Sequence, residues 1–211
     1  MTFALRRPVK LSKKDDPVAE LMLKPRGQAL RGLQVAMGQD EGRIIEEISV
    51  GALARAGLRM AGVGADYLAQ TMTQMHAREV MELHRVVRKM LAEPPGEVEE
   101  GVERIVRESD DAVIFKLAEP VQFNAKTALI SELRLEATGR ALQDLSYLIS
   151  EEGHLRLVRT DVHALALLGV RMASTMGDIA FVDVMHPHDV WGLAMLALSF
   201  IEGGSTTGNT P

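Results

Sequence analysis

Two histidines and an aspartate beside one proline form the most promising chemical cluster in this chain of 211 residues. They occur as His186-Pro187-His188-Asp189, and imidazole and carboxylate groups can bind metal ions or transfer protons. A zinc site needs three or four converging ligands, and the neighbouring sequence does not supply the others. Proline is favoured at the first position of a helix, and an acid is favoured near the helix start. The pattern therefore predicts a helix that starts after His186, with a metal site as the alternative.

Other side chains that could take part in catalysis are scattered along the chain. His84, His154 and His163 are isolated, and no nucleophile has a recognisable base or turn motif around it. The stretch Gly62-Val63-Gly64 resembles part of a phosphate-binding loop but lacks the third glycine and the lysine, so it predicts a helix break. We therefore expect no enzymatic activity, no cofactor and no bound metal.

Composition narrows the choice of partner and compartment. The net charge is −5 without a block of like charges, which disfavours nucleic acid and anionic membranes as partners. The chain has no cysteine, and its first residues lack the apolar core of a secretion signal. The most apolar run, Val190 to Ile201, is about half as long as a membrane span. These features predict a cytoplasmic protein without a transmembrane segment.

The elements that must position these residues are encoded in a segment that occurs twice. The first copy is ELMLKPRGQALRGL, Glu20 to Leu33, and the second is ELRLEATGRALQDL, Glu132 to Leu145. Each begins with apolar and polar residues in alternation, which is typical of a half-buried strand. After the glycine of each copy the apolar residues fall at helical spacing. The pattern predicts a strand and then a helix, over Gln28–Met37 in the first copy and up to Ile149 in the second.

The repetition extends over most of the chain. The segment LRRPVKL recurs as LAEPVQF, the helix cap Ser49 recurs as Asp161, and Met75-His76 recurs as Met185-His186. The predicted fold class is α+β, mostly helical, with two tandem copies of a β-hairpin followed by three to four helices. We expect the copies to form a pseudo-twofold pair whose hairpins pair edge to edge or face each other across a shared core.

Composition breaks give the expected domain boundaries. Residues 1–92 form the first copy, and the segment AEPPG that follows starts a linker over residues 93–111. Val98, Val102, Ile105 and Val106 share one face, which predicts a short helix within Glu97–Ser109. Residues 112–201 form the second copy, and residues 202–211 are expected to be a flexible polar tail.

The last helix differs between the two copies. In the first copy Val80, Leu83 and Val87 lie on one face and charged residues lie on the other. The second copy reads VWGLAMLALSFI, which is apolar on nearly every side and must therefore be covered. It is either a central helix between the domains or a docking surface for another protein. The candidate partner-binding residues are Trp191, Met195, Leu198, Val80, Leu83 and Val87.

The first copy resembles the tail assembly chaperone family of contractile-tailed bacteriophages. Members look like an apolar strand ending near LR-x-P, followed by G-x-LRGL, a helical region, and a helix start of the type Asp-Pro-x-Asp. The matching residues of the first part are Leu23, Pro25, Gly27, Leu30, Arg31, Gly32 and Leu33. The second copy matches the last part at Pro187 and Asp189, with His186 where the family tends to have an acid. It departs from the first part at Ala137 and Gln143, and members look like single copies.

The resemblance implies a non-enzymatic phage chaperone that keeps the tape measure protein soluble during tail morphogenesis. The tail tube protein and a second copy of the chain are further candidate partners, and the compartment would be the host cytoplasm. One alternative is a structural tail or baseplate subunit that stays in the particle. A second is a DNA-binding regulator that uses Arg85, Arg88 and Lys89, although the second copy lacks these basic residues.

Overall fold

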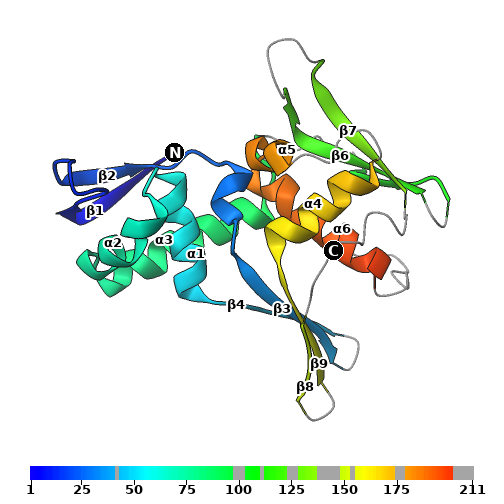
Figure 1. The fold of residues 1–211 in the computed structure, drawn as a ribbon, viewed down its shortest axis with the longest axis horizontal. Coiled ribbons are helices and arrows are strands. Elements are labelled where there is room, and N and C mark those ends of the chain that lie inside the picture. Colours follow the sequence, from blue (N-terminus) through cyan, green and yellow to red (C-terminus); the bar gives the residue numbers. More distant parts are fainter. Residues whose placement is uncertain are drawn as a thin grey trace.

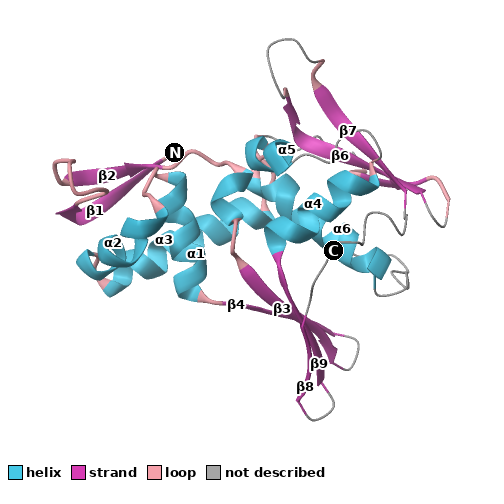
Figure 2. Cartoon of the chain, viewed as in Figure 1, coloured by secondary structure: helices cyan, strands magenta, loops and turns pink. Residues whose placement is uncertain are grey.

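The chain adopts an α+β fold in which helices form the middle and small sheets project from them (Figures 1 and 2). The computed structural model describes residues 1–40, 43–96, 103–109, 112–122, 128–136, 148–152, 155–173 and 179–201. Within these ranges it contains six α-helices and three antiparallel sheets. The predicted α+β class is therefore confirmed.

The first half begins with a hairpin and ends with helices. Its elements are β1 (Thr2–Val9), β2 (Val18–Met22), the 3-10 helix η1 (Gly27–Leu30), β3 (Gln34–Asp40), β4 (Arg43–Ile48), α1 (Val50–Met60), the 3-10 helix η2 (Ala65–Tyr67), α2 (Leu68–Gln74) and α3 (Ala77–Ala92). Strands β1 and β2 pair as the predicted hairpin, and residues 10–17 connect them.

The second half follows a similar order of elements. It contains β5 (Ile105–Arg107), β6 (Ala112–Val121), β7 (Ile130–Glu136), β8 (Leu148–Glu152), β9 (Leu155–Asp161), α4 (Val162–Met172), α5 (Ile179–Val184) and α6 (Pro187–Ile201). Strands β5, β6 and β7 form one sheet, whereas β1 and β2 form another. The two expected hairpins are thus in different sheets, and the prediction that they pair edge to edge is wrong.

The predicted helix caps are found. The Ser49 hydroxyl accepts a hydrogen bond from the Ala52 N–H at 3.4 Å, and the Asp161 carboxylate accepts one from the Ala164 N–H at 2.9 Å. Both side chains satisfy an amide of the first helical turn that has no intrahelical partner. At the other end of α1, Gly62 has φ +87°, a left-handed conformation that ends the helix. This glycine is the predicted helix break.

The helix predicted over Gln28–Met37 is wrong. The chain makes only the short η1 turn, and Gly32 then takes a left-handed φ of +73°, which interrupts any helix. From Gln34 onward the backbone lies between two strands, because β3 pairs with β4 on one side and β9 on the other. These long-range hydrogen bonds outweigh the helical spacing of the apolar residues. In the second half, residues 137–147 lie outside the described ranges, and Ile149 belongs to strand β8.

The helix predicted in the linker is also wrong where the structure describes it. Residues 97–102 lie outside the described ranges, and Ile105–Arg107 form strand β5. This strand pairs with β6, with Ile105 opposite Phe115. The linker thus adds a third strand to the hairpin that follows it.

The largest sheet joins the two halves and has the order β4-β3-β9-β8. A twofold axis through this sheet would pair strands at matching sequence positions, β3 with β8 or β4 with β9. The structure instead pairs β3 with β9, with Met37 opposite Val158. The expected pseudo-twofold relation is therefore wrong for this sheet.

Two helix pairs form the core, α1 with α3 in the first half and α4 with α6 in the second half. Each pair contacts closely at a glycine. A β-carbon on Gly57 would lie 2.7 Å from Leu83, and one on Gly169 would lie 2.6 Å from Leu193. Because such contacts are too short, each glycine lets its helix approach a leucine of the partner helix. The buried apolar side chains of the two halves belong to one cluster.

Candidate functional site

The His186-Pro187-His188-Asp189 segment begins α6. The His186 ring nitrogen Nδ1 accepts a hydrogen bond from the His188 N–H at 3.2 Å, which caps the first turn. His76 caps α3 in the same way, with its Nδ1 3.2 Å from the Arg78 N. Within the described ranges, no three histidine, aspartate or glutamate side chains come together as a metal site would require. The helix-start interpretation of the segment is therefore confirmed.

Asp189 is fully buried and contacts an irregularity in strand β6. Its carboxylate accepts hydrogen bonds from the Ala118 N–H at 2.8 Å and the Glu119 N–H at 3.2 Å. Both amides lie where the β6–β7 register shifts, between Lys116 and Val121. A shifted register leaves backbone groups without ladder partners, and the carboxylate satisfies them.

Glu79 contacts the matching strand irregularity in the first half. It is buried, it occupies the same position in α3 as Asp189 in α6, and its carboxylate accepts a hydrogen bond from the Arg6 N–H. Arg6 lies between Ala4 and Val9, where the β1–β2 register shifts. In both halves, therefore, an acid in the first turn of the last helix fixes an irregularity in the first long strand.

Arg104 adds a cation to the second of these sites. Its guanidinium pairs with the Asp189 carboxylate and donates to the Lys116 carbonyl oxygen at 2.8 Å. The same group lies 5.3 Å from the centre of the Phe115 ring, within range of a cation–π contact. The sequence did not indicate a role for Arg104, because its partner Asp189 is 85 residues away along the chain.

A second polar cluster ties the η1 turn to the second half. Arg31 pairs with Asp183 of α5, and Asp183 also contacts the His163 ring nitrogen Nε2 at 2.9 Å. The Gly27 N–H donates to the Met185 carbonyl oxygen at 2.8 Å. A β-carbon on Gly27 would overlap the Val182 carbonyl oxygen, so the turn approaches α5 backbone to backbone. The residues that carry the family resemblance therefore form a turn that packs against the second half of this protein.

Three histidines lie near this junction, and the pKa of each is lowered from its ordinary value. Burial lowers the pKa of His163, although its hydrogen bond to the Asp183 carboxylate raises that pKa. Burial likewise lowers the pKa of His186 and of His188. The His188 ring Nδ1 lies 2.8 Å from the Leu91 carbonyl oxygen at the end of α3, so it joins the ends of two helices.

Helix α6 is buried on one side and half-buried on the other. It packs against α4 and β6 of its own half and against α3 and η1 of the first half, and none of its residues is exposed. Of the candidate partner-binding residues, Leu198, Leu83 and Val87 are buried in the core, whereas Val80, Trp191 and Met195 are half-buried against it. The side chains of Val80, Trp191 and Met195 are therefore partly open to solvent.

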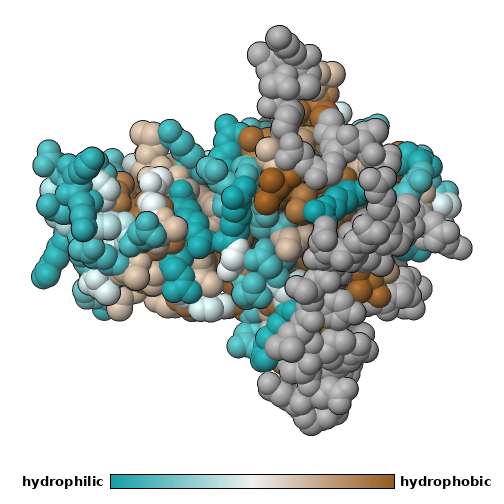
Figure 3. Space-filling model, in the orientation of Figure 1, coloured by the Kyte–Doolittle hydropathy of each residue, from teal (hydrophilic) through white to brown (hydrophobic). Residues whose placement is uncertain are grey.

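Other apolar side chains are more exposed than the predicted candidates. Met22 on β2 is 65% exposed and Met81 on α3 is 39% exposed. Leu129 and Ile179 in the second half are also exposed. In Figure 3 hydrophilic residues cover the end formed by β1 and β2, and hydrophobic residues reach the surface around α4 and α5.

The basic residues of α3 lie on its solvent face. Arg85, Arg88 and Lys89 are all exposed. The Arg88 guanidinium lies 4.0 Å from the Glu46 carboxylate, and the Lys89 ammonium lies 3.4 Å from the Glu93 carboxylate. Acidic neighbours reduce the positive field that a DNA-recognition helix requires.

Comparison with known proteins adds no relative to these observations. In the described part of the chain, no helix has both the length and the apolar character needed to cross a bilayer. No protein-family model, curated protein or solved structure matches the chain.

Proposed function

We propose that the protein is a non-enzymatic phage tail assembly chaperone that binds and solubilises the tape measure protein during tail morphogenesis. The observation that carries the proposal is the motif shared with that family, from Leu23 to Leu33. Its apolar members Leu23, Leu30 and Leu33 are buried, and its two glycines occupy positions that require glycine. Most of the matched residues thus have a defined structural role, which supports the resemblance.

The proposal includes a duplication of one structural unit. The caps Ser49 and Asp161, the acids Glu79 and Asp189, and the close glycine contacts at Gly57 and Gly169 occur at corresponding places in the two halves. Agreement of caps, strand irregularities and close contacts supports a common origin. Two linked modules would bind an extended client more tightly than either module alone, because binding of the first raises the effective concentration of the second.

The client surface is proposed to include the open side of α6. Trp191 and Met195 are half-buried side chains one helical turn apart. The corresponding positions of α3 are Met81 and Arg85, so the second half presents the more apolar side at this place. A tape measure protein is long, helical and apolar, and aromatic and methionine side chains suit such a partner.

The proposal is tested by co-expression with a tape measure protein, which would be sought as a long, apolar, helical reading frame beside the gene for this chain. We expect the wild type to keep that client soluble, and Trp191→Asp to reduce the soluble client at least about tenfold, as loss of an aromatic anchor does. Met81→Asp changes the corresponding position on α3 and is the matched control. Circular dichroism and the melting temperature establish that both variants fold.

Two outcomes would contradict the proposal. If a folded Trp191→Asp variant keeps the client soluble as well as the wild type, α6 is not the client surface. If mass spectrometry finds the protein in purified mature particles, it is a structural tail or baseplate subunit rather than a chaperone that leaves.

A further inference from the structure

The sheet that joins the two halves repeats a two-strand unit in one direction. Strands β3 and β4 form the first unit, and β8 and β9 form the second. By sequence position β8 corresponds to β3, and β9 corresponds to β4. The order β4-β3-β9-β8 therefore places each unit in the same orientation, and the second unit follows the first by translation along the sheet.

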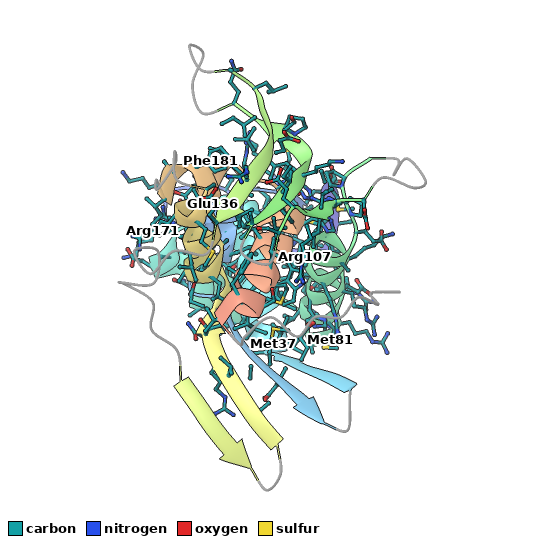
Figure 4. The ribbon with its side chains drawn as sticks, turned by 90° about the vertical axis from the view of Figure 1, so that its right-hand side faces the viewer. Met37, Met81, Arg107, Glu136, Arg171 and Phe181 are labelled. Atoms are coloured by element: carbon teal, nitrogen blue, oxygen red, sulfur yellow. The ribbon has the colours of Figure 1, made fainter. Side chains whose placement is uncertain are left out.

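A translational repeat leaves two different and complementary edges. Within the described ranges, β4 and β8 each pair with a single strand, and Figure 4 shows them at opposite sides of the four strands that extend below the helices. The internal joint pairs β3 with β9. Because β8 corresponds to β3, its free edge matches the edge of β3 that pairs with β9. Because β4 corresponds to β9, its free edge matches the edge of β9 that pairs with β3.

We propose that β8 of one molecule pairs with β4 of a second copy of this chain, in the register of the internal β3–β9 joint. That joint places Met37 opposite Val158 and Ala36 opposite Arg159. Transferred to the free edges, the register places Ile149 opposite Glu46 and Leu148 opposite Glu47. The contact is head to tail, so each added copy presents a new free edge and the sheet continues through successive molecules.

This inference rests on the correspondence between the two halves and not on chaperone activity. A protein that fails to solubilise a client can still associate in this way. Conversely, a monomeric protein that keeps the client soluble would support the proposed function and contradict the edge contact. Self-association and client solubility are therefore measured separately.

Engineered disulfides test both the partner and the register, because the chain contains no cysteine. Glu46→Cys and Ile149→Cys are made as separate full-length proteins, purified, mixed and oxidised mildly. Directly opposed residues on antiparallel strands lie about 4.5–5.5 Å apart, which suits a disulfide. Within one molecule the two edges are about 14 Å apart, three strand spacings of about 4.8 Å, so an intramolecular bridge cannot form.

We expect the mixture to give at least about tenfold more disulfide dimer than either variant oxidised alone, since only opposed positions meet disulfide geometry. The double variant carries both cysteines in one chain and should give a ladder of dimers, trimers and longer species. Glu47→Cys mixed with Ile149→Cys is the matched control. Neighbouring residues point to opposite faces of a strand, so this pair should form little disulfide.

Three results would overturn the proposal. The first is a mixture that stays monomeric on non-reducing gels while circular dichroism shows folded protein. The second is efficient dimer formation by Glu46→Cys alone or Ile149→Cys alone, which would show a symmetric edge contact. The third is equal disulfide formation by the shifted control pair, which would show random collision rather than a defined register.

Discussion

At the scale of single residues, two buried acids connect the last helix of each half to its first long strand. Asp189 and Glu79 both occupy the first turn of a helix, where a negative charge is favoured. Each also accepts a backbone hydrogen bond at a place where a strand shifts register. One carboxylate thus serves a helix end and a strand irregularity together, which fixes the angle between the two elements.

Removing the Asp189 carboxylate should destabilise the whole protein. Asp189→Ala leaves the Ala118 and Glu119 N–H groups without an acceptor and leaves the Arg104 guanidinium without its anion. Loss of one partner of a buried ion pair costs about 3–5 kcal/mol of unfolding free energy. Urea unfolding measures this loss.

Glu136→Ala is the control for this variant, because it removes an exposed partner of Arg134. Exposed ion pairs contribute little, so its urea midpoint should stay near that of the wild type. If Asp189→Ala changed the midpoint as little as the control does, the buried carboxylate would have no structural role.

The sequence predicted the position of Asp189 but only part of its role. Asp189 was expected near a helix start because local spacing with Pro187 indicates one. Its burial and its link to Arg104 depend on residues far away along the chain, and a single sequence carries no sign of such pairing. The caps Ser49 and Asp161 were predictable because both partners lie within one helical turn.

At the scale of elements, the local spacing of apolar residues predicted an element correctly where its packing partners lie in the same half of the chain. The helices that start after Ser49 and His76 have one apolar stripe each, and both were found. Strand β3 was predicted as a helix, because Leu30, Leu33 and Met37 fall at helical spacing. Its ladder partner β9 comes from the other half of the chain, and no local pattern reveals that pairing.

The junction between η1, α5 and the start of α6 should weaken in acid. The ordinary histidine pKa is 6.5, and the pKa values of His163, His186 and His188 are lowered by burial. Below pH 6.5 the unfolded chain binds more protons than the folded protein until the lowered pKa values are reached. The free energy of unfolding should therefore fall as pH decreases from about 7 through this window. Urea midpoints at a series of pH values measure the fall.

His186→Asn provides the matched control for this pH dependence. Asparagine is a good helix cap, so it replaces the role of His186 Nδ1 without a titrating ring. Its urea midpoint should decline less steeply between pH 7 and the acid end of the window. A wild type whose midpoint rises on acidification, or a variant with an unchanged slope, would contradict this assignment.

At the scale of the whole molecule, the two halves are joined more closely than the boundary AEPPG suggests. The β3–β9 ladder, the contact of Gly27 with Met185 and the ion pair of Arg31 with Asp183 all cross between them. The sequence repeat indicated two similar units. It did not indicate how they join, because the joint pairs strands that do not correspond.

These contacts predict that the halves unfold together, and Trp191 can report on it because it is the only tryptophan. Leu53 is fully buried in α1 of the first half, and Leu53→Ala should cost about 2–5 kcal/mol by leaving a cavity. If the protein is one cooperative unit, this change lowers the midpoint seen by Trp191 fluorescence as much as the midpoint seen by circular dichroism.

The corresponding residue of α4, Leu165, is also fully buried and supplies the comparison. Leu165→Ala removes the same atoms within the half that contains Trp191, so it should shift both signals whether or not the halves are coupled. Leu53→Ala separates the two cases. Halves that unfold independently would leave the Trp191 midpoint unchanged in that variant, because its cavity lies in the other unit. Coincident shifts in both variants would instead require that the ladder and ion pairs across the joint hold one cooperative structure.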